Sequence, residues 1–242
     1  MEHKRTLDRR AFLMKTSTLM AGTATGLAVF VKPAIPLLRQ EKDEEVKVSP
    51  AEDLMREHGV LKRVLLVYQE IDSRLTGGKN FPLETLTGAA DIIKNFIEDY
   101  HEKLEENFLF PRFRKAGRLT ELVSVLETQH NRGRMITDFI LKDSPAALKS
   151  TPDPDIRRKL TDSIRRFVRM YNPHEAREDT VLFPAFRTIL PESEYDSLGE
   201  EFEKQEQDKF GEDGFEKYVE KVAELEKSLE IYELAMFTPK VL

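Results

Sequence analysis

Four histidines are the residues of this chain best suited to bind a ligand, and two of them are followed four residues later by a glutamate. Residues four apart lie on one face of a helix, so His101 with Glu105, and His174 with Glu178, each present a nitrogen and a carboxylate together. Several imidazoles and carboxylates would be costly to bury unpaired. A metal cation of intermediate hardness binds both donor types. The predicted metal ligands are His58, His101, Glu105, His130, His174 and Glu178.

An internal repeat relates these positions to one another. Residues 101–105 and 174–178 both read His-Glu-x-x-Glu, and Leu-Phe-Pro follows each of them, at 109–111 and 182–184. These matching positions lie 73 residues apart, while the pairs Glu57-His58 and Gln129-His130 lie 72 apart. A fixed offset of this kind indicates two copies of one helical hairpin, each with one histidine on its first helix and the His-Glu-x-x-Glu motif on its second.

Apolar residues at helical spacing predict the four helices that must position these side chains. Ser49 and Pro50 form a helix start, with Ser as N-cap, and Gly77-Gly78 ends that helix. A loop over residues 143–154, marked by three prolines, separates the third helix from the fourth. The buried stripe of the second helix is expected to include Phe108, and that of the fourth Val181 and Ala185. No stretch alternates with a period of two, so no strand is predicted.

These elements predict an all-α fold, an up-down-up-down four-helix bundle with extra C-terminal helices. We divide the chain into a signal over 1–34, a linker over 35–48, the bundle over 49–190 and an acidic helical extension over 191–242. From His58 to Gly77, and from Pro82 to His101, the chain runs 19 residues, or about 28 Å of helix. His58 and His101 therefore return to the same level of the bundle. The legs of the second hairpin are less equal, about 13 and 20 residues, but the loop over 143–154 can absorb the difference, so all four helices can bring a histidine to one layer. The last helix is expected to cap the bundle or to form a homodimer contact.

The N-terminal segment differs in charge from the rest of the chain. Residues 1–40 carry seven Lys/Arg and two Asp/Glu, a net charge of +5. Because the whole chain has a net charge of −6, the other 202 residues have a net charge of −11. Arg9-Arg10, Phe12-Leu13 and a mild apolar run over 18–31 resemble a twin-arginine export signal. The resemblance implies the twin-arginine export machinery as a partner and a periplasmic or extracytoplasmic location. An uncleaved leader would instead tether the protein to a membrane.

Composition narrows the function classes. The chain has no cysteine, which excludes disulfides, thiolate zinc sites and Cys-ligated iron–sulfur clusters. The net charge of −6 argues against binding nucleic acid, because neutralising phosphates requires a surplus of Lys and Arg. Structural zinc is a poor match to the histidines and glutamates, because such sites are usually rich in cysteine.

Six ligand residues in this order on four helices resemble a hemerythrin-like (HHE cation-binding) domain over roughly residues 50–190. The resemblance implies a non-haem di-iron centre with an oxo or hydroxo bridge inside the bundle. Glu105 and Glu178 would bridge the irons, and the four histidines would be terminal ligands. Manganese remains an alternative, because the ligand preferences of these ions overlap.

This sequence departs from the oxygen-carrying members of that family, which have a fifth histidine in an HxxxH pair on the third helix. Here Arg134 lies four residues after His130, and Leu126 lies four before it. Each iron would therefore keep an open position. Glu102 and Glu175 follow ligand histidines directly, so they are either salt-bridge residues or weaker candidate ligands.

Three functions are consistent with such a centre. The first is binding of a small diatomic ligand such as oxygen or nitric oxide. The second is a di-iron redox enzyme, either a reductase of nitric oxide or peroxide or a ferroxidase. The third is iron delivery or repair in the cell envelope, which the acidic body would favour by attracting cations. The sequence alone does not choose among them.

Overall fold

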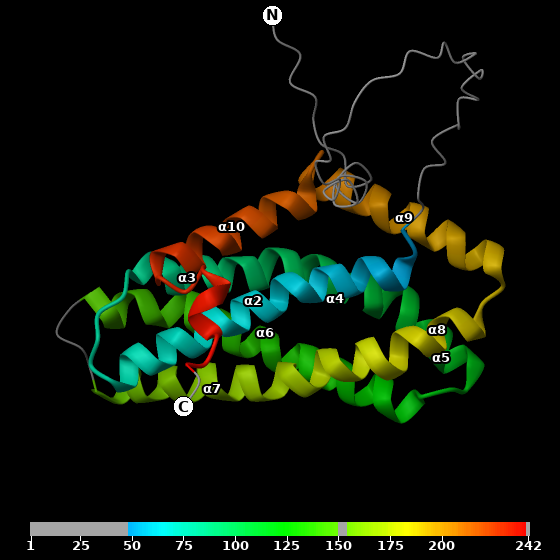
Figure 1. The fold of residues 1–242 in the computed structure, drawn as a ribbon. Helices are drawn as coiled ribbons and strands as arrows, with labels where there is room; N and C mark the ends of the chain where they lie inside the picture. The colour runs from blue at the N-terminus through cyan, green and yellow to red at the C-terminus, as the bar shows by residue number, and fades with distance from the viewer. Residues whose placement is uncertain (1–47, 150–153, 241–242) are drawn as a thin grey trace, which may run out of the picture.

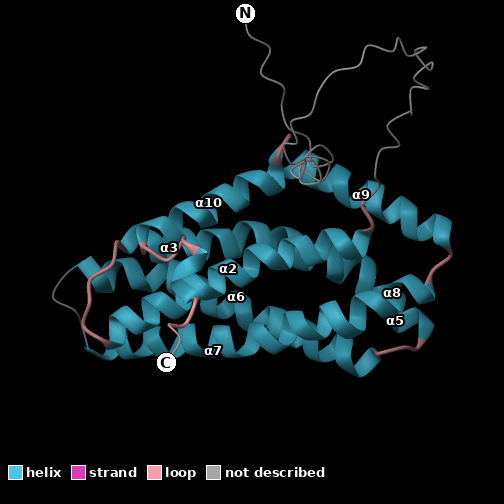
Figure 2. Cartoon of the chain, viewed as in Figure 1, coloured by secondary structure: helices cyan, strands magenta, loops and turns pink. Residues whose placement is uncertain are grey.

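The computed structural model describes residues 48–149 and 154–240, and every regular element within them is helical. Figure 2 shows helices joined by short loops, without a strand in these residues. The all-α prediction is confirmed. The proposed signal over 1–34, nearly all of the linker, and His3 lie outside the described residues.

Four long helical rods run side by side and form the bundle (Figure 1). Two of them are single helices, α2 (Pro50–Thr76) and α6 (Thr120–Lys149). The other two are continuous rods in which α-helical and π-helical turns alternate. The second rod consists of α3 (Leu83–Ile92), η1 (Ile93–His101), α4 (Glu102–Leu104), η2 (Glu105–Leu109) and α5 (Phe110–Ala116). The fourth rod consists of α7 (Pro154–Arg177), η3 (Glu178–Leu182) and α8 (Phe183–Ile189).

The ends of the rods follow the capping chemistry of the sequence. The Ser49 hydroxyl accepts a hydrogen bond from the Glu52 amide at 3.3 Å, so it satisfies one of the free N–H groups at the start of α2. Gly117 ends α5 in the left-handed conformation, with φ of 63°, which glycine adopts without strain.

The predicted loop over 143–154 was wrong in its first half, because α6 continues to Lys149. A proline within a helix removes one backbone hydrogen bond, and the sequence after Pro145 consists of the good helix formers Ala-Ala-Leu-Lys, which let the helix resume. The fourth rod then begins at Pro154, the last of the three prolines.

The π-helical turns displace the buried stripes from the predicted residues. A π turn holds one more residue than an α turn, so every position after it rotates around the rod. Leu182 and Phe186 are therefore buried, whereas the predicted Val181 and Ala185 are only half-buried. The second rod shows the same shift, because Leu109 is buried and Phe108 is half-buried.

Two further helices, α9 (Glu192–Phe210) and α10 (Gly214–Ser228), form a layer on one side of the bundle (Figure 1). They pack against α2, and α10 also packs against α3. The Arg63 guanidinium on α2 donates to both carboxylate oxygens of Glu226 on α10, at 2.9 and 2.5 Å. The last helix thus covers the bundle of its own chain. A short 3₁₀ turn, η4 (Leu234–Phe237), follows it.

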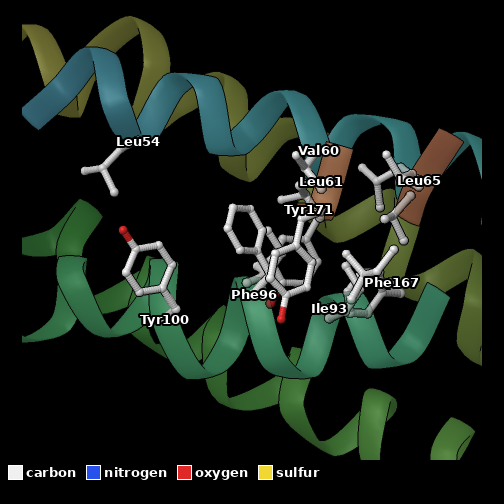
Figure 3. Close-up of a cluster of buried hydrophobic side chains, with 14 of the residues drawn as sticks. Leu54, Val60, Leu61, Leu65, Ile93, Phe96, Tyr100, Phe167 and Tyr171 are labelled. Carbon is white, nitrogen blue, oxygen red and sulfur yellow. The ribbon is translucent and has the colours of Figure 1, made fainter. Parts of the chain in front are cut away.

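Aliphatic and aromatic side chains fill the space between the rods. Figure 3 shows leucines of α2 facing the aromatic residues Phe96, Tyr171 and Phe167, with Tyr100 closer to Leu54. Among the described helices, none combines the length and apolar composition that crossing a membrane requires. The packed rods also hold a group of buried polar and charged side chains within an otherwise apolar core.

Candidate metal centre

The structure brings all six predicted ligand side chains together in one buried layer. Their exposed fractions range from 0 to 4%. The Nε2 atoms of His58 and His101 are 3.0 Å apart, and those of His130 and His174 are 3.2 Å apart. The imidazoles therefore point inward as two pairs. We call the space at His58 and His101 position A, and the space at His130 and His174 position B.

The two glutamates connect the pairs. A Glu105 oxygen lies 3.8 Å from His101 Nε2 and 3.4 Å from His130 Nε2, so it reaches from position A to position B. A Glu178 oxygen lies 3.4 Å from His58 Nε2 and 3.2 Å from His174 Nε2, and so reaches both positions as well. Each position is thus surrounded by two imidazole nitrogens and the oxygens of two carboxylates.

The outer nitrogen of every imidazole meets an acceptor of its own. In each case Nδ1 lies 2.8 to 3.1 Å from a side-chain oxygen, to which it donates, so in the neutral imidazole the lone pair that can bind a cation is on the inward Nε2. The pairs are His58 with Asp179, His101 with Glu57, His130 with Glu106 and His174 with Gln129.

Sequence reasoning missed these outer partners, although the repeat contained the signal. Glu57 and Gln129 directly precede the histidines of the two hairpins, and Glu106 and Asp179 directly follow the two glutamates. Each pair is related by the same offset as the ligands, 72 or 73 residues. A polar residue beside each ligand in both copies is the pattern expected of outer-sphere partners.

The Leu-Phe-Pro phrase of the repeat positions an aromatic ring over one histidine on each side. The ring of Phe183 stacks on His58, with 5.4 Å between centroids, and the ring of Phe110 stacks on His130 at 5.5 Å. Both phenylalanines are buried. The layer of donors is therefore enclosed by apolar walls.

A π-helical turn begins at each bridging glutamate, since η2 starts at Glu105 and η3 at Glu178. The proline that follows each turn, Pro111 or Pro184, has no N–H and would clash with the carbonyl four residues earlier in a regular α-helix. Widening the preceding turn relieves that clash, and single π turns occur frequently at functional sites. A proline alone does not predict such a turn, because Pro173 lies inside α7 without a π turn before it, and η1 is not followed by a proline.

Comparison with known proteins supports the same assignment. Residues 49–146 match the family model of the hemerythrin HHE cation-binding domain. Residues 49–146, which are 98 of the 242 residues, therefore form a domain of this kind. The match covers nearly all of the first three rods, and the internal repeat supplies His174 and Glu178 on the fourth.

Two curated relatives share most of this hemerythrin-like chain. They are uncharacterised proteins of Mycobacterium bovis and Mycobacterium tuberculosis, each 49% identical over 197 residues. The aligned segment covers 81% of this chain and 76% of each relative. No solved structure is significantly similar to the chain.

The donors of this hemerythrin domain are suited to cations. All four carboxylate oxygens of Glu105 and Glu178 are buried, and none accepts a hydrogen bond from the part of the chain that the structure describes. Buried carboxylates without partners are costly unless they pair with a charge or bind a metal. Together with the inward Nε2 lone pairs, these atoms form a metal-binding site with nitrogen and oxygen donors.

Burial and neighbouring charges shift the pKa values of these donors in opposite directions. Burial raises the pKa of Glu105 well above its ordinary value, and the charge of Glu178 raises it further. Burial opposes ionisation of Glu178 too, but His174 and His58 outweigh it and hold the pKa of Glu178 well below its ordinary value. Burial also lowers the pKa of His58, yet Asp179 and Glu178 overcome this and raise it to about 9. Protons thus compete with metal for this site.

Glu102 and Glu175, the weaker candidate ligands, both lie in ion pairs with residues four positions after a ligand histidine. Glu102 accepts hydrogen bonds from Arg134 at 2.6 Å and from the Tyr171 hydroxyl at 2.7 Å. Glu175 pairs with Lys62. Arg134, four residues after His130, thus serves as a partner of an outer carboxylate.

Proposed function

We propose that this protein holds two iron ions at positions A and B and binds a small diatomic molecule such as oxygen or nitric oxide. The observation that carries the proposal is the convergence of four inward imidazole nitrogens with two bridging carboxylates in one buried layer. Nitrogen and oxygen donors in this ratio suit iron, with manganese as the alternative.

The residues around the layer limit what can reach it. An iron pair with open coordination positions binds or reduces small molecules that accept electrons. His58 and His130 each lie under a phenylalanine ring, and the six ligands are at most 4% exposed. A charged or bulky substrate would have to lose its hydration to pass these apolar side chains. Small uncharged molecules such as oxygen and nitric oxide do not face that penalty.

Reduction of nitric oxide or peroxide is the second candidate function, and a chain of polar groups favours it. Tyr171 donates to Glu102, Arg134 joins Glu102 to Glu106, and Glu106 accepts from His130. Two carboxylates that can hold protons, Glu106 and Glu102, therefore lie beside position B, and Arg134 fixes both in place. A reductase consumes protons at its centre, whereas reversible binding of oxygen does not require such a chain.

One experiment tests the proposal and separates the two candidates. The protein is purified without air, its metal content is measured, and the reduced form is mixed with oxygen in a stopped-flow spectrometer. We expect two irons per chain and an optical change that reverses when oxygen is removed. Repeated turnover with an electron donor would favour the reductase instead. A protein without bound iron or manganese would refute both.

The location of the protein is a separate proposal, based on the resemblance of the leader to a twin-arginine signal. We infer export in the folded, metal-loaded state, with residues 1–34 as the signal. Replacing Arg9 and Arg10 by lysine should retain the protein inside the cell, whereas a change at Lys15 should not. Unaltered export of the double-lysine variant, assayed by cell fractionation, would contradict this proposal.

A further inference from the structure

The repeat that relates positions A and B is broken at one outer partner. At position A both imidazoles donate to carboxylates, His58 to Asp179 and His101 to Glu57, each at 2.8 Å. At position B His130 donates to a carboxylate at 3.1 Å, but His174 donates to the uncharged amide oxygen of Gln129 at 2.8 Å. Gln129 occupies the place that Glu57 has in the first hairpin.

The carboxylates beside His130 are shared with cations: Glu106 accepts its hydrogen bond, Glu102 lies 4.0 Å from its Nδ1, and Arg134 pairs with both. Glu106 binds Arg134 at 2.6 Å and Lys103 at 2.5 Å, so its charge is largely offset before it acts on His130. The outer partners at position B are therefore one amide, at His174, and carboxylates that are ion-paired with Arg134 and Lys103, at His130.

Further carboxyl groups lie behind position A. Carboxyl oxygens of Asp53 and Glu206 lie within 4.8 Å of an oxygen of Glu57, and all three side chains are buried. His101 thus donates to a member of a carboxyl cluster, whereas His174 donates to an amide. The two metal positions have the same types of ligand but differ in the groups that accept hydrogen bonds from the ligand imidazoles.

An outer carboxylate makes a ligating imidazole more basic, and loss of such a partner costs about 10- to 100-fold in metal affinity. We propose that the two positions differ in metal affinity because Glu57 is a carboxylate and Gln129 is an amide. Position A then binds the first divalent cation, and binds it more tightly than position B. This proposal rests on the proposed two-metal function. It also assigns Glu57 and Gln129 as positioning residues that set the order of loading.

The repeat offers matched variants that test this order. Glu57→Gln keeps an acceptor for His101 but removes the charge, and Gln129→Glu adds the charge behind His174. The double variant E57Q/Q129E exchanges the two partners between the hairpins. Glu175→Gln is the control, because it removes a buried carboxylate that pairs with Lys62 and hydrogen-bonds no imidazole in the described structure.

Metal-free protein with nitrogen-15 in its histidines is titrated with Zn²⁺ as a diamagnetic probe, by NMR and by calorimetry. We expect the ring signals of His58 and His101 to shift first, with two dissociation constants about 10- to 100-fold apart. E57Q or Q129E should narrow this gap, the double variant should reverse the order, and E175Q should leave it unchanged.

The possible failures are distinguishable. Simultaneous shifts of all four histidines in the wild-type protein, or an order that survives in the double variant, would overturn the inference while the two-metal function stands. An E175Q effect as large as that of E57Q would also overturn it, because charge alone would then account for the order. Absence of Zn²⁺ binding at these histidines would refute the two-metal function itself.

Discussion

Replacing Gly133 by alanine should destabilise the protein strongly, although alanine normally stabilises a helix. Gly133 lies in α6 where the Tyr171 side chain crosses it. A Cβ at this position would lie 2.1 Å from the Tyr171 hydroxyl and 2.9 Å from its ring, far closer than atoms can pack. The ring is 1% exposed and packs against Phe167, with 4.4 Å between centroids, so it cannot simply swing away.

The size of the effect follows from three contributions. Forcing an extra methyl into a packed core costs about 1–3 kcal/mol. Moving the Tyr171 hydroxyl breaks its hydrogen bond to Glu102 and leaves buried polar atoms unsatisfied, at about 1–3 kcal/mol. The helix propensity of alanine returns about 1 kcal/mol. We therefore expect a net loss of about 3 kcal/mol in the free energy of unfolding.

Urea denaturation of the metal-free protein, followed by circular dichroism, measures this loss. Gly59→Ala is the matched control, because Gly59 is also inside a long helix but its Cβ would have nothing within 4 Å. The control should unfold at the same or slightly higher urea than the wild type. If G133A were as stable as G59A, the described packing of Tyr171 over α6 would be wrong.

Three further predictions concern charge, metal and capping. Burial raises the pKa of Glu98 from 4.5 to about 7, so between these pH values the unfolded chain releases a proton that the folded one keeps, and stability falls as pH rises. Glu98→Gln should remove this slope, as urea unfolding from pH 4.5 to 7 would show; an unchanged slope would refute it. Glu105→Ala should sharply lower metal content by elemental analysis, because both positions lose a carboxylate; full occupancy would exclude bridging. Ser49→Ala should cost about 1 kcal/mol in the same unfolding assay, and no loss would mean that the cap is not formed in solution.

The six donors could be foreseen because their chemistry restricts both residue type and spacing. Histidine in an apolar stripe and glutamate four residues later are rare combinations, and the repeat doubles the signal. The common level of His58 and His101 followed from the equal lengths of chain between each of them and the turn. The bundle was foreseen because α2 and α6 keep a regular helical period through the layer.

What the sequence did not reveal depends on local backbone changes and on contacts between helices. The predicted stripes assumed a constant period, so the π turns at Glu105 and Glu178 moved Phe108 and Val181 off the buried face. The outer partners escaped because each contact joins two helices, for example Asp179 on the fourth rod with His58 on the first. Spacing within one helix carries no direct information about such pairs.

The most direct test of the two-metal account is a crystal of the iron-loaded protein measured at the iron absorption edge. Anomalous difference density should show two peaks, one against Nε2 of His58 and His101 and the other against Nε2 of His130 and His174. A single peak, or peaks outside this layer, would contradict the claim that the repeated hairpins together bind a pair of metal ions.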